Sequence, residues 1–275
     1  MTTEFFSAEI QCDRLLIDAE LHRIMVEEQP SFGQSVSQCM SYAIFSGGKR
    51  VRPLLGLQVA RALACNPLDC LTQLAAVEIL HSASLIIDDL PCMDNAVFRR
   101  SRPSAHRQFG EQIAILAAIA MITLAINLAE TESATSNAVS VRQFRRMLLD
   151  AFGRGGLIAG QEADLAHKDL SLAAYTKTTP LFELSCAAGL ISANLAIEHR
   201  LQIIAFGRNF GRAFQAIDDF EDGGDRYASS AFIELSQCSE TLTELESTCA
   251  EFKRLREFIS FLETKRPASF EVAQK

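Results

Sequence analysis

The sequence predicts an all-α protein that forms a single domain, and two observations lead to this prediction. Apolar residues make up 48% of the 275 residues, whereas glycine occurs 14 times and proline 7 times. So few turn-forming residues in an apolar-rich chain favour long helices over a sheet with many turns. No linker rich in proline, glycine or serine divides the chain, so residues 1–275 are expected to form one domain.

Individual helices are predicted where apolar residues recur at helical spacing. The segments that show this pattern are residues 6–26, 36–44, 51–63, 71–85, 144–152, 187–195, 201–217 and 245–262. Proline and glycine interrupt the pattern, and breaks are expected at Pro30, Gly47-Gly48, Asn66-Pro67, Pro103, Gly155-Gly156 and Gly223-Gly224. The sequence therefore predicts many helices joined by short turns.

Charge and cysteine content restrict the partners and the compartment. The formal net charge of −8 argues against nucleic acid as a partner, because binding the phosphate backbone requires a broad electropositive surface. The eight cysteines include no CxxC pair, so neither a zinc site nor a disulfide framework is indicated. We expect free thiols in a reducing cytoplasm, and the N-terminal residues do not resemble a secretory signal.

Residues 113–129 form an uncharged stretch, which makes them a candidate for a membrane-spanning helix. The stretch is shorter than the ~20 residues that a spanning helix needs, and it contains Thr123 and Asn127. We therefore expect no membrane span. Two interpretations stay open, which are a helix buried within the monomer and a helix at the interface of a homodimer.

Two groups of carboxylates directly follow apolar helical segments. SLIIDDLPCMD carries Asp88, Asp89 and Asp94, and FQAIDDFED carries Asp218, Asp219, Glu221 and Asp222. Like charges at this spacing repel one another, and burial among apolar residues adds a desolvation cost. Divalent cations between the carboxylates would offset both penalties, and oxygen-only ligands indicate Mg²⁺ rather than zinc. For either motif alone, the alternative is a solvated acidic helix end.

Two short basic segments supply the cations that an anionic ligand such as a diphosphate needs. FSGGKRVRP carries Lys49, Arg50 and Arg52, and FRRSRPSAH carries Arg99, Arg100, Arg102 and His106. Forked guanidinium groups bind phosphate oxygens well. Each segment alone is also compatible with a solvated loop.

Together these motifs resemble those of the trans-isoprenyl diphosphate synthases, the family of farnesyl and geranylgeranyl diphosphate synthases. The resemblance lies between Phe45 and Asp222 and rests on GGKRVRP, HSASLIIDDLPCMDN, RRSRP, GQEAD at residues 160–164, YTKTTPLFELS and FQAIDDFED. It implies the isoprenoid synthase fold, a bundle of antiparallel helices around a central cavity, with one polyprenyl synthetase domain over residues 1–275.

The resemblance also implies roles for individual residues. The Mg²⁺ cofactor would be bound by Asp88, Asp94 and Asp218, with support from Asp89, Asp219 and Asp222. Isopentenyl diphosphate would be bound by Lys49, Arg52, His81 and Arg100, the allylic diphosphate by Arg99 and Lys177, and Gln161 is a further substrate-binding candidate. Thr178 and Gln215 match polar groups beside the developing carbocation, and with Lys177 they form the catalytic set.

The implied reaction condenses isopentenyl diphosphate with an allylic diphosphate to give geranylgeranyl or farnesyl diphosphate. Metal ions and cationic side chains stabilise the departing diphosphate, and the isopentenyl double bond adds to the allylic cation before a proton is lost. The implied partners are these two substrates and a second copy of the chain.

Product length is expected to depend on Ala83 and Ser84, which precede Asp88 by five and four residues. At that spacing they should lie one helical turn below the metal site. Two small side chains leave room for a long product and favour geranylgeranyl over farnesyl, and Ala83→Tyr is expected to shift products toward farnesyl diphosphate. The alternative is that both residues are small for helix packing alone.

The chain departs from the family pattern at several positions. Ala96 and Val97 replace two acids, Ile87 replaces a common histidine, and Ile119 replaces an aspartate. The segment after the second motif reads DGGDRYASSAFIELS, where the family has a lysine-bearing loop.

The first lysine after that segment is Lys253, so Arg226 is the candidate substitute for the missing lysine. These departures keep open a non-catalytic or weakly active regulatory subunit. Retention of both acidic motifs favours catalysis. A third alternative is a terpene cyclase. It would not need GGKRVRP to bind a second diphosphate, so the presence of this segment favours the synthase.

Overall fold

The computed structural model describes residues 7–132, 138–153, 155–166, 170–223 and 227–265, without the side chains of residues 29, 164, 170–175 and 222. The helices are α1 (Ala8–Glu28), α2 (Gln34–Phe45), α3 (Val51–Ala62), α4 (Leu71–Asp88), α5 (Ala105–Phe109), α6 (Glu111–Leu128), α7 (Ala138–Phe152), α8 (Leu157–Leu165), α9 (Leu170–Gly189), α10 (Ile197–Gly223), α11 (Ala228–Thr248) and α12 (Arg256–Glu263). The all-α prediction is confirmed.

Short elements connect the helices. They are the 3-10 turns η1 (Gln29–Ser31), η2 (Pro67–Cys70) and η4 (Ala250–Leu255), and an antiparallel hairpin of β1 (Phe98–Arg99) and β2 (Arg102–Pro103). The hairpin contains the RRSRP segment, so the second basic motif sits on a tight turn between α4 and α5.

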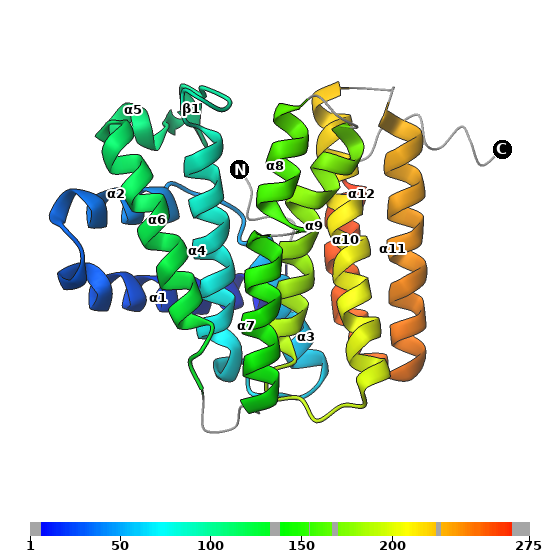
Figure 1. Ribbon diagram of the computed structural model, residues 1–275. Helices are drawn as coiled ribbons and strands as arrows, with labels where there is room; N and C mark the ends of the chain where they lie inside the picture. The colour runs from blue at the N-terminus through cyan, green and yellow to red at the C-terminus, as the bar shows by residue number, and fades with distance from the viewer. Residues whose placement is uncertain (1–6, 133–137, 154, 167–169, 224–226, 266–275) are drawn as a thin grey trace.

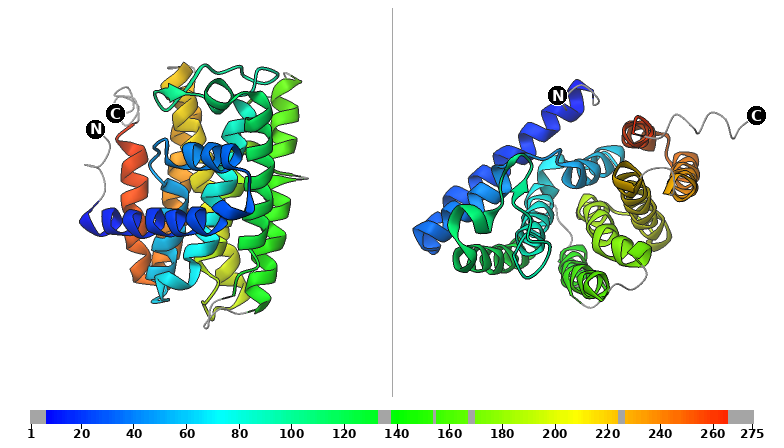
Figure 2. Two further views of the ribbon diagram at one scale, coloured as in Figure 1. Left: turned by 90° about the vertical axis from the view of Figure 1, so that its left-hand side faces the viewer. Right: turned by 90° about the horizontal axis from the view of Figure 1, so that it is seen from above.

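The axes of most long helices are roughly aligned, and α1 runs across them on one side of the bundle (Figures 1 and 2). Helix α9 packs against α3, α8 and α10, and α4 packs against α6, α3 and α9. Both helices that end in acidic motifs, α4 and α10, therefore contact α9. This arrangement places the two motifs around a common neighbour.

Close approach of α3 to α9 depends on two glycines. A Cβ atom on Gly56 would lie 2.3 Å from the carbonyl oxygen of Ser185, and one on Gly189 would lie 2.3 Å from that of Gly56. No side chain fits at such distances, so the two backbones pack directly against each other. Among the described residues, the larger of two clusters of buried apolar residues extends from Ile10 to Leu262.

Two predicted helix segments differ from the structure. Helix α9 ends at Gly189, so residues 190–195 do not continue it as expected. The predicted segment 245–262 is interrupted at Cys249, whose extended backbone ends α11 before η4 begins. Apolar spacing alone does not reveal these interruptions, because the residues on both sides pack into the same core.

Two helical segments are long and apolar enough to cross a membrane by length and composition. They are Pro67–Asp88 and Glu111–Leu128, and within an apolar stretch of 18 residues in each, 78% and 39% respectively are buried inside the bundle. The first is a core helix. In the second, Ile115, Leu116 and Ile119 are 43%, 52% and 53% exposed, so burial within the monomer does not account for its whole apolar surface.

Candidate functional site

A cavity of about 600 Å³ is lined mainly by basic side chains. Its charged lining residues are Arg14, Lys49, Arg50, Arg52, Arg99 and Arg100, against Glu78 and Asp218. Six basic and two acidic groups give an excess of four positive charges, in a chain whose net charge is −8. This local reversal of sign favours an anionic ligand. We call it the basic cavity.

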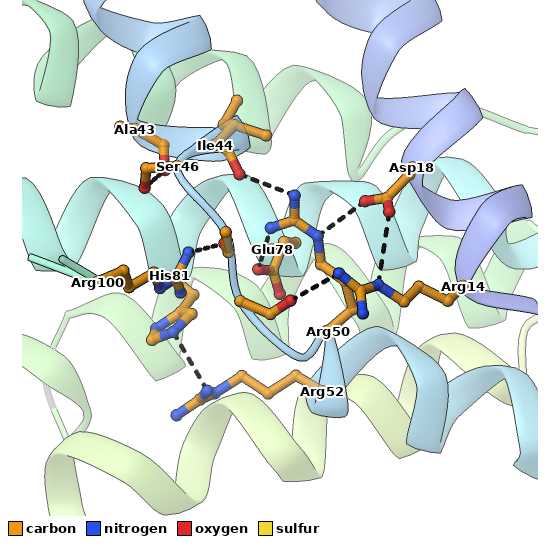
Figure 3. Close-up of polar contacts among 12 residues, drawn as sticks. Arg14, Asp18, Ala43, Ile44, Ser46, Arg50, Arg52, Glu78, His81 and Arg100 are labelled. Atoms are coloured by element: carbon orange, nitrogen blue, oxygen red, sulfur yellow. Dashed lines mark hydrogen bonds and ion pairs between the residues drawn. The ribbon is translucent and has the colours of Figure 1, made fainter. Parts of the chain in front are cut away.

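The Gly47-Gly48 turn forms one wall of the basic cavity and is interlocked with Arg100. Both glycines have positive φ angles, +110° and +121°, which other residues rarely adopt. Arg100 donates from Nη1 to the carbonyl oxygen of Gly47, and a Cβ atom on Gly48 would lie 2.8 Å from that nitrogen (Figure 3). The two basic segments of the sequence therefore meet at this turn.

Arg50 anchors the turn and does not extend freely into the cavity. It donates to Asp18 at 2.9 Å, to Glu78 at 2.8 Å and to the carbonyl oxygen of Ile44 at 2.8 Å (Figure 3). Only 5% of Arg50 is exposed. These bonds tie the turn to α1, α2 and α4 and leave Lys49 and Arg52 to face a ligand.

Arg52 and His81 form a pair within the basic cavity, with Nη1 of Arg52 3.2 Å from Nε2 of His81 (Figure 3). The guanidinium of Arg52 also lies 4.8 Å and 5.8 Å from the ring centroids of Phe182 and Phe214. Burial lowers the pKa of Arg52 to about 10, so the side chain remains charged at neutral pH. Its buried Nε has no hydrogen-bond partner among the described residues, which leaves a donor for an anion.

Burial, with a further contribution from the surrounding arginines, lowers the pKa of His81 well below its usual value of 6.5. The ring is therefore neutral near pH 7. Because an arginine can only donate, Nε2 of His81 accepts the hydrogen bond from Arg52 and the ring proton lies on Nδ1.

A second cavity, of about 530 Å³, is mainly apolar. Its lining residues are Ser84, Ile87, Asp88, Met93, Phe152, Leu157, Ile158, Gln161, Glu162, Leu165, Ala166 and Lys177. Gln161 donates to the sulfur of Met93 at 3.7 Å, and in the described part of the chain its buried Oε1 has no hydrogen-bond partner. We call it the apolar cavity, and its apolar lining suits a hydrocarbon chain.

The two residues expected to set product length occupy different environments. Ser84 lines the apolar cavity, as does Ile87, which stands where a histidine is common. Ala83 is fully buried in the helical core and is not part of the cavity lining. Of the two residues, Ser84 thus lies on the cavity lining and Ala83 does not, because successive helix residues point about 100° apart.

Contacts through α9 connect the two acidic motifs. Nζ of Lys177 lies 3.8 Å from Oδ2 of Asp88, at the end of α4. The neighbouring Thr178 donates its hydroxyl hydrogen to Oε1 of Gln215 at 2.5 Å, and Nε2 of Gln215 donates to Asp219 at 2.8 Å. The three residues predicted to be catalytic thus lie between the motifs.

Burial also perturbs the acidic residues. It raises the pKa of Asp88 to about 6, an effect that Asp94 increases and Lys177 opposes. Burial raises the pKa of Asp218 as well, and there Lys265 opposes it. A carboxylate with a raised pKa lacks part of the positive charge that would stabilise its ionised form.

This donor set fits Mg²⁺ that is bound together with a ligand. Among the described side chains, which exclude that of Asp222, no three His, Cys, Asp or Glu groups lie close enough to hold a metal ion by themselves. Mg²⁺ is usually bound through one or two carboxylates, with water and substrate phosphates completing its shell. Asp88 and Asp218 provide such carboxylates at the ends of two helices.

Asp89, which is predicted to support the metal site, holds an arginine in the structure. Asp89 is 2% exposed, and its carboxylate accepts hydrogen bonds from Arg99, with Nε at 3.0 Å and Nη2 at 2.5 Å from Oδ1. Asp89 therefore orients Arg99, which lines the basic cavity. The exposed Asp94 follows the end of α4, and its backbone N–H donates to the carbonyl oxygen of Asp88 at 2.9 Å.

Two predicted positions lie outside the described residues, namely the side chain of Asp222 and the whole of Arg226. Other residues are part of the site although the motifs did not indicate them. Phe214 lines the basic cavity, Phe152 lines the apolar one, and Glu78 holds Arg50. The phenylalanines look like ordinary core residues in the sequence. Of these three residues, only Glu78 stands out in the sequence as a candidate for the site, because it is an acid within a strongly apolar helix.

Comparisons with known proteins agree with these motifs. The polyprenyl synthetase family profile matches residues 33–229. Geranylgeranyl diphosphate synthase of Pantoea ananas is 38% identical over 221 residues, which cover 74% of this chain and 71% of that enzyme. Geranylgeranyl pyrophosphate synthase 10, mitochondrial, of Arabidopsis thaliana is 35% identical over 199 residues, which cover 68% of this chain but only 57% of the relative.

Solved structures match over more of the chain. An FPP/GFPP synthase from Zymomonas mobilis superposes with a TM-score of 0.82 at 27% identity, covering 93% of this chain and 99% of that one. A geranyltransferase from Legionella pneumophila superposes with a TM-score of 0.78 at 26% identity, covering 94% and 99%.

Proposed function

The chain belongs to the polyprenyl synthetase family, and from this premise we propose that it is a Mg²⁺-dependent trans-prenyltransferase that joins isopentenyl diphosphate to an allylic diphosphate. The geranylgeranyl diphosphate synthases among its relatives and the FPP/GFPP synthase among its structural neighbours support this activity. The proposed products are geranylgeranyl or farnesyl diphosphate.

The observation that carries the proposal is the position of α4 between two cavities of opposite character. His81 and Leu85 line the basic cavity, whereas Ser84, Ile87 and Asp88 line the apolar one. A prenyl diphosphate combines a charged head with a hydrocarbon tail, so both of its parts find a matching environment on this helix. We place the reacting end of the allylic substrate beside Asp88.

In this proposal the basic cavity binds isopentenyl diphosphate. Lys49, Arg52 and Arg100 provide positive charge, and Nε of Arg52 can donate without giving up an existing hydrogen bond. Neutral His81 fixes the guanidinium of Arg52 without adding another positive charge. Arg50 keeps the Gly47-Gly48 turn in place.

The allylic diphosphate would leave from the region between Asp88 and Asp218. Bound Mg²⁺ would supply additional positive charge to the departing group. Lys177 and Arg99 are oriented in advance by Asp88 and Asp89 respectively, so they need little rearrangement as charge develops.

The allylic cation would form next to Thr178 and Gln215. Thr178 donates its hydrogen to Gln215, so the lone pairs of the hydroxyl oxygen remain available to stabilise positive charge. The growing chain would extend into the apolar cavity past Ser84 and toward Phe152. Exclusion of water from this cavity would protect the cation from capture.

We also propose that the protein is a homodimer that pairs through α6. The exposed Ile115, Leu116 and Ile119 lie on this helix, and exposed apolar patches of this kind mark interaction sites. Gel filtration with light scattering is expected to give twice the mass of 30.2 kDa. Leu116→Glu should give the monomer, and a wild-type monomer would contradict the proposal.

Incorporation of radiolabelled isopentenyl diphosphate tests the proposed activity. Purified protein with Mg²⁺ and geranyl or farnesyl diphosphate is expected to form a longer prenyl diphosphate, which chromatography will size. The absence of incorporation by the protein alone, with either acceptor, would contradict the proposal. Stimulation of an added synthase without intrinsic incorporation would instead support a regulatory subunit.

A further inference from the structure

A lysine from the far end of the chain lies on the second acidic motif. Nζ of Lys265, two residues after the end of α12, is 3.5 Å from Oδ1 of Asp218 and forms an ion pair with Glu221. The side chain of Lys265 is 17% exposed, whereas those of Asp218 and Glu221 are 40% and 44% exposed. The cation is therefore the least exposed member of this group.

The position of α12 explains how Lys265 reaches the motif. Helix α12 packs against α10 and α11, and its end lies near the end of α10 (Figure 2). Between Tyr227 and Lys265 the sequence contains one other lysine, Lys253, which is exposed in η4. In the described part of this segment, Lys265 is thus the lysine that contacts the acidic motif.

Lys265 is also close to the basic cavity. The ammonium groups of Lys49 and Lys265 lie 4.9 Å and 5.8 Å from the centroid of the Phe261 ring. Burial lowers the pKa of Lys49, and the nearby charge of Lys265 lowers it further. Two like charges approach each other here, an arrangement that an anion between or beside them would stabilise.

We propose that Lys265 binds a diphosphate oxygen at the second acidic motif, and that in the ligand-free protein it acts as the counterion of Asp218. This inference rests on the proposed function. Lys265 and a divalent cation compete for the carboxylate of Asp218, because the two cations repel one another. Arrival of Mg²⁺ with a diphosphate releases the ammonium from Asp218 and offers it a phosphate oxygen nearby.

Lys265→Met tests the proposal, because it removes the charge and keeps an unbranched side chain of similar length. Two affinities are measured by calorimetry, those for Mn²⁺ alone and for inorganic pyrophosphate at saturating Mg²⁺. Loss of the competing ammonium is expected to raise Mn²⁺ affinity. Loss of a charge-assisted hydrogen bond is expected to weaken pyrophosphate binding by roughly tenfold or more.

Matched variants separate this role from a structural one. Arg256→Met removes an ion pair between α12 and Glu246 of α11, and it is expected to leave both affinities unchanged. Lys265→Arg keeps the charge and is expected to restore most of the pyrophosphate affinity. Opposite shifts in the two affinities are the signature of the proposal, since loosening of α12 would weaken both together.

The outcomes also separate this proposal from the proposed function. Wild-type protein that fails to bind pyrophosphate with Mg²⁺ would contradict both. Normal binding by the wild type, with either unchanged affinities or a parallel loss of both in Lys265→Met, would overturn only the role of Lys265. Neither measurement depends on turnover.

Discussion

Arg52 and His81 meet in the basic cavity, where the guanidinium donates to a neutral imidazole at 3.2 Å. The histidine fixes the position of a charged side chain without contributing charge. This keeps the ligand-free cavity from accumulating one more cation among its arginines. Protonation of His81 would break the hydrogen bond and add to the repulsion, so the pair is sensitive to acid.

The contribution of His81 to stability is therefore expected to fall as the pH falls below about 6.5. The pKa of His81 is lowered in the folded protein, so between its folded value and its usual value of 6.5 the unfolded chain binds more protons. Stability from this group is present above pH 6.5 and declines by up to about 1.4 kcal/mol per pH unit below it. Urea unfolding without substrates, between pH 5 and 8, measures the slope.

The slope due to His81 is obtained by comparison with His81→Gln, which should show less loss of stability in acid. His199→Gln, on the exposed surface of α10, serves as the control and is expected to keep the wild-type slope. Equal slopes for all three proteins would show that His81 is not held neutral by its surroundings.

Replacement of Arg52 by lysine is expected to raise the KM for isopentenyl diphosphate by roughly tenfold or more, because one forked donor with ring contacts is lost. The KM for the allylic substrate should change little. Lys253→Ala, which alters an exposed charge elsewhere, is the control. Steady-state kinetics with each substrate varied in turn will distinguish these effects, and equal increases in both KM values would argue against separate subsites.

Asp88 and Asp89 are adjacent but are expected to respond differently to the same substitution. Asp88→Asn should weaken Mg²⁺ binding in the presence of pyrophosphate, whereas Asp89→Asn should leave it nearly unchanged. Because Asp89 holds Arg99, its substitution should instead raise the KM for the allylic diphosphate. Calorimetry and kinetics together provide the comparison. Loss of metal binding in Asp89→Asn would show that Asp89 contributes to the metal site.

Ser84→Phe is expected to shorten the main product, because Ser84 lines the apolar cavity and an aromatic ring there would block it. Ala83→Phe is the matched control. Ala83 is fully buried in the core, so overpacking should cost about 1–3 kcal/mol of stability without a specific change in chain length. Chromatography will compare the product lengths of the two variants. A shorter product from Ala83→Phe, with no change in Ser84→Phe, would refute the assignment of Ser84.

Much of this site could be predicted from sequence because its motifs combine charges with unusual surroundings. The glycines at positions 47 and 48 and the basic residues after them predicted an anion-binding turn, and both glycines adopt positive φ angles there. The acids at the ends of apolar helices predicted the ends of α4 and α10. Both motifs lie within short segments of the sequence, so they can be recognised without knowledge of the fold.

What sequence could not reveal depends on contacts between distant segments. The bond from Arg99 to Asp89, the inward turn of Arg50 toward Asp18 and Glu78, and the approach of Lys265 to Asp218 require the packed bundle. Helical spacing also could not decide between Ala83 and Ser84. Which of two adjacent small residues faces a cavity depends on the rotation of α4 against α8 and α9.

The most direct test of the two-cavity account is a crystal structure with Mg²⁺, isopentenyl diphosphate and an unreactive thio analogue of geranyl diphosphate. The account predicts one diphosphate in the basic cavity within hydrogen-bonding distance of Arg52, and the geranyl chain along Ser84 and Ile87. A geranyl chain bound outside the apolar cavity, or a basic cavity that takes up no diphosphate, would contradict it.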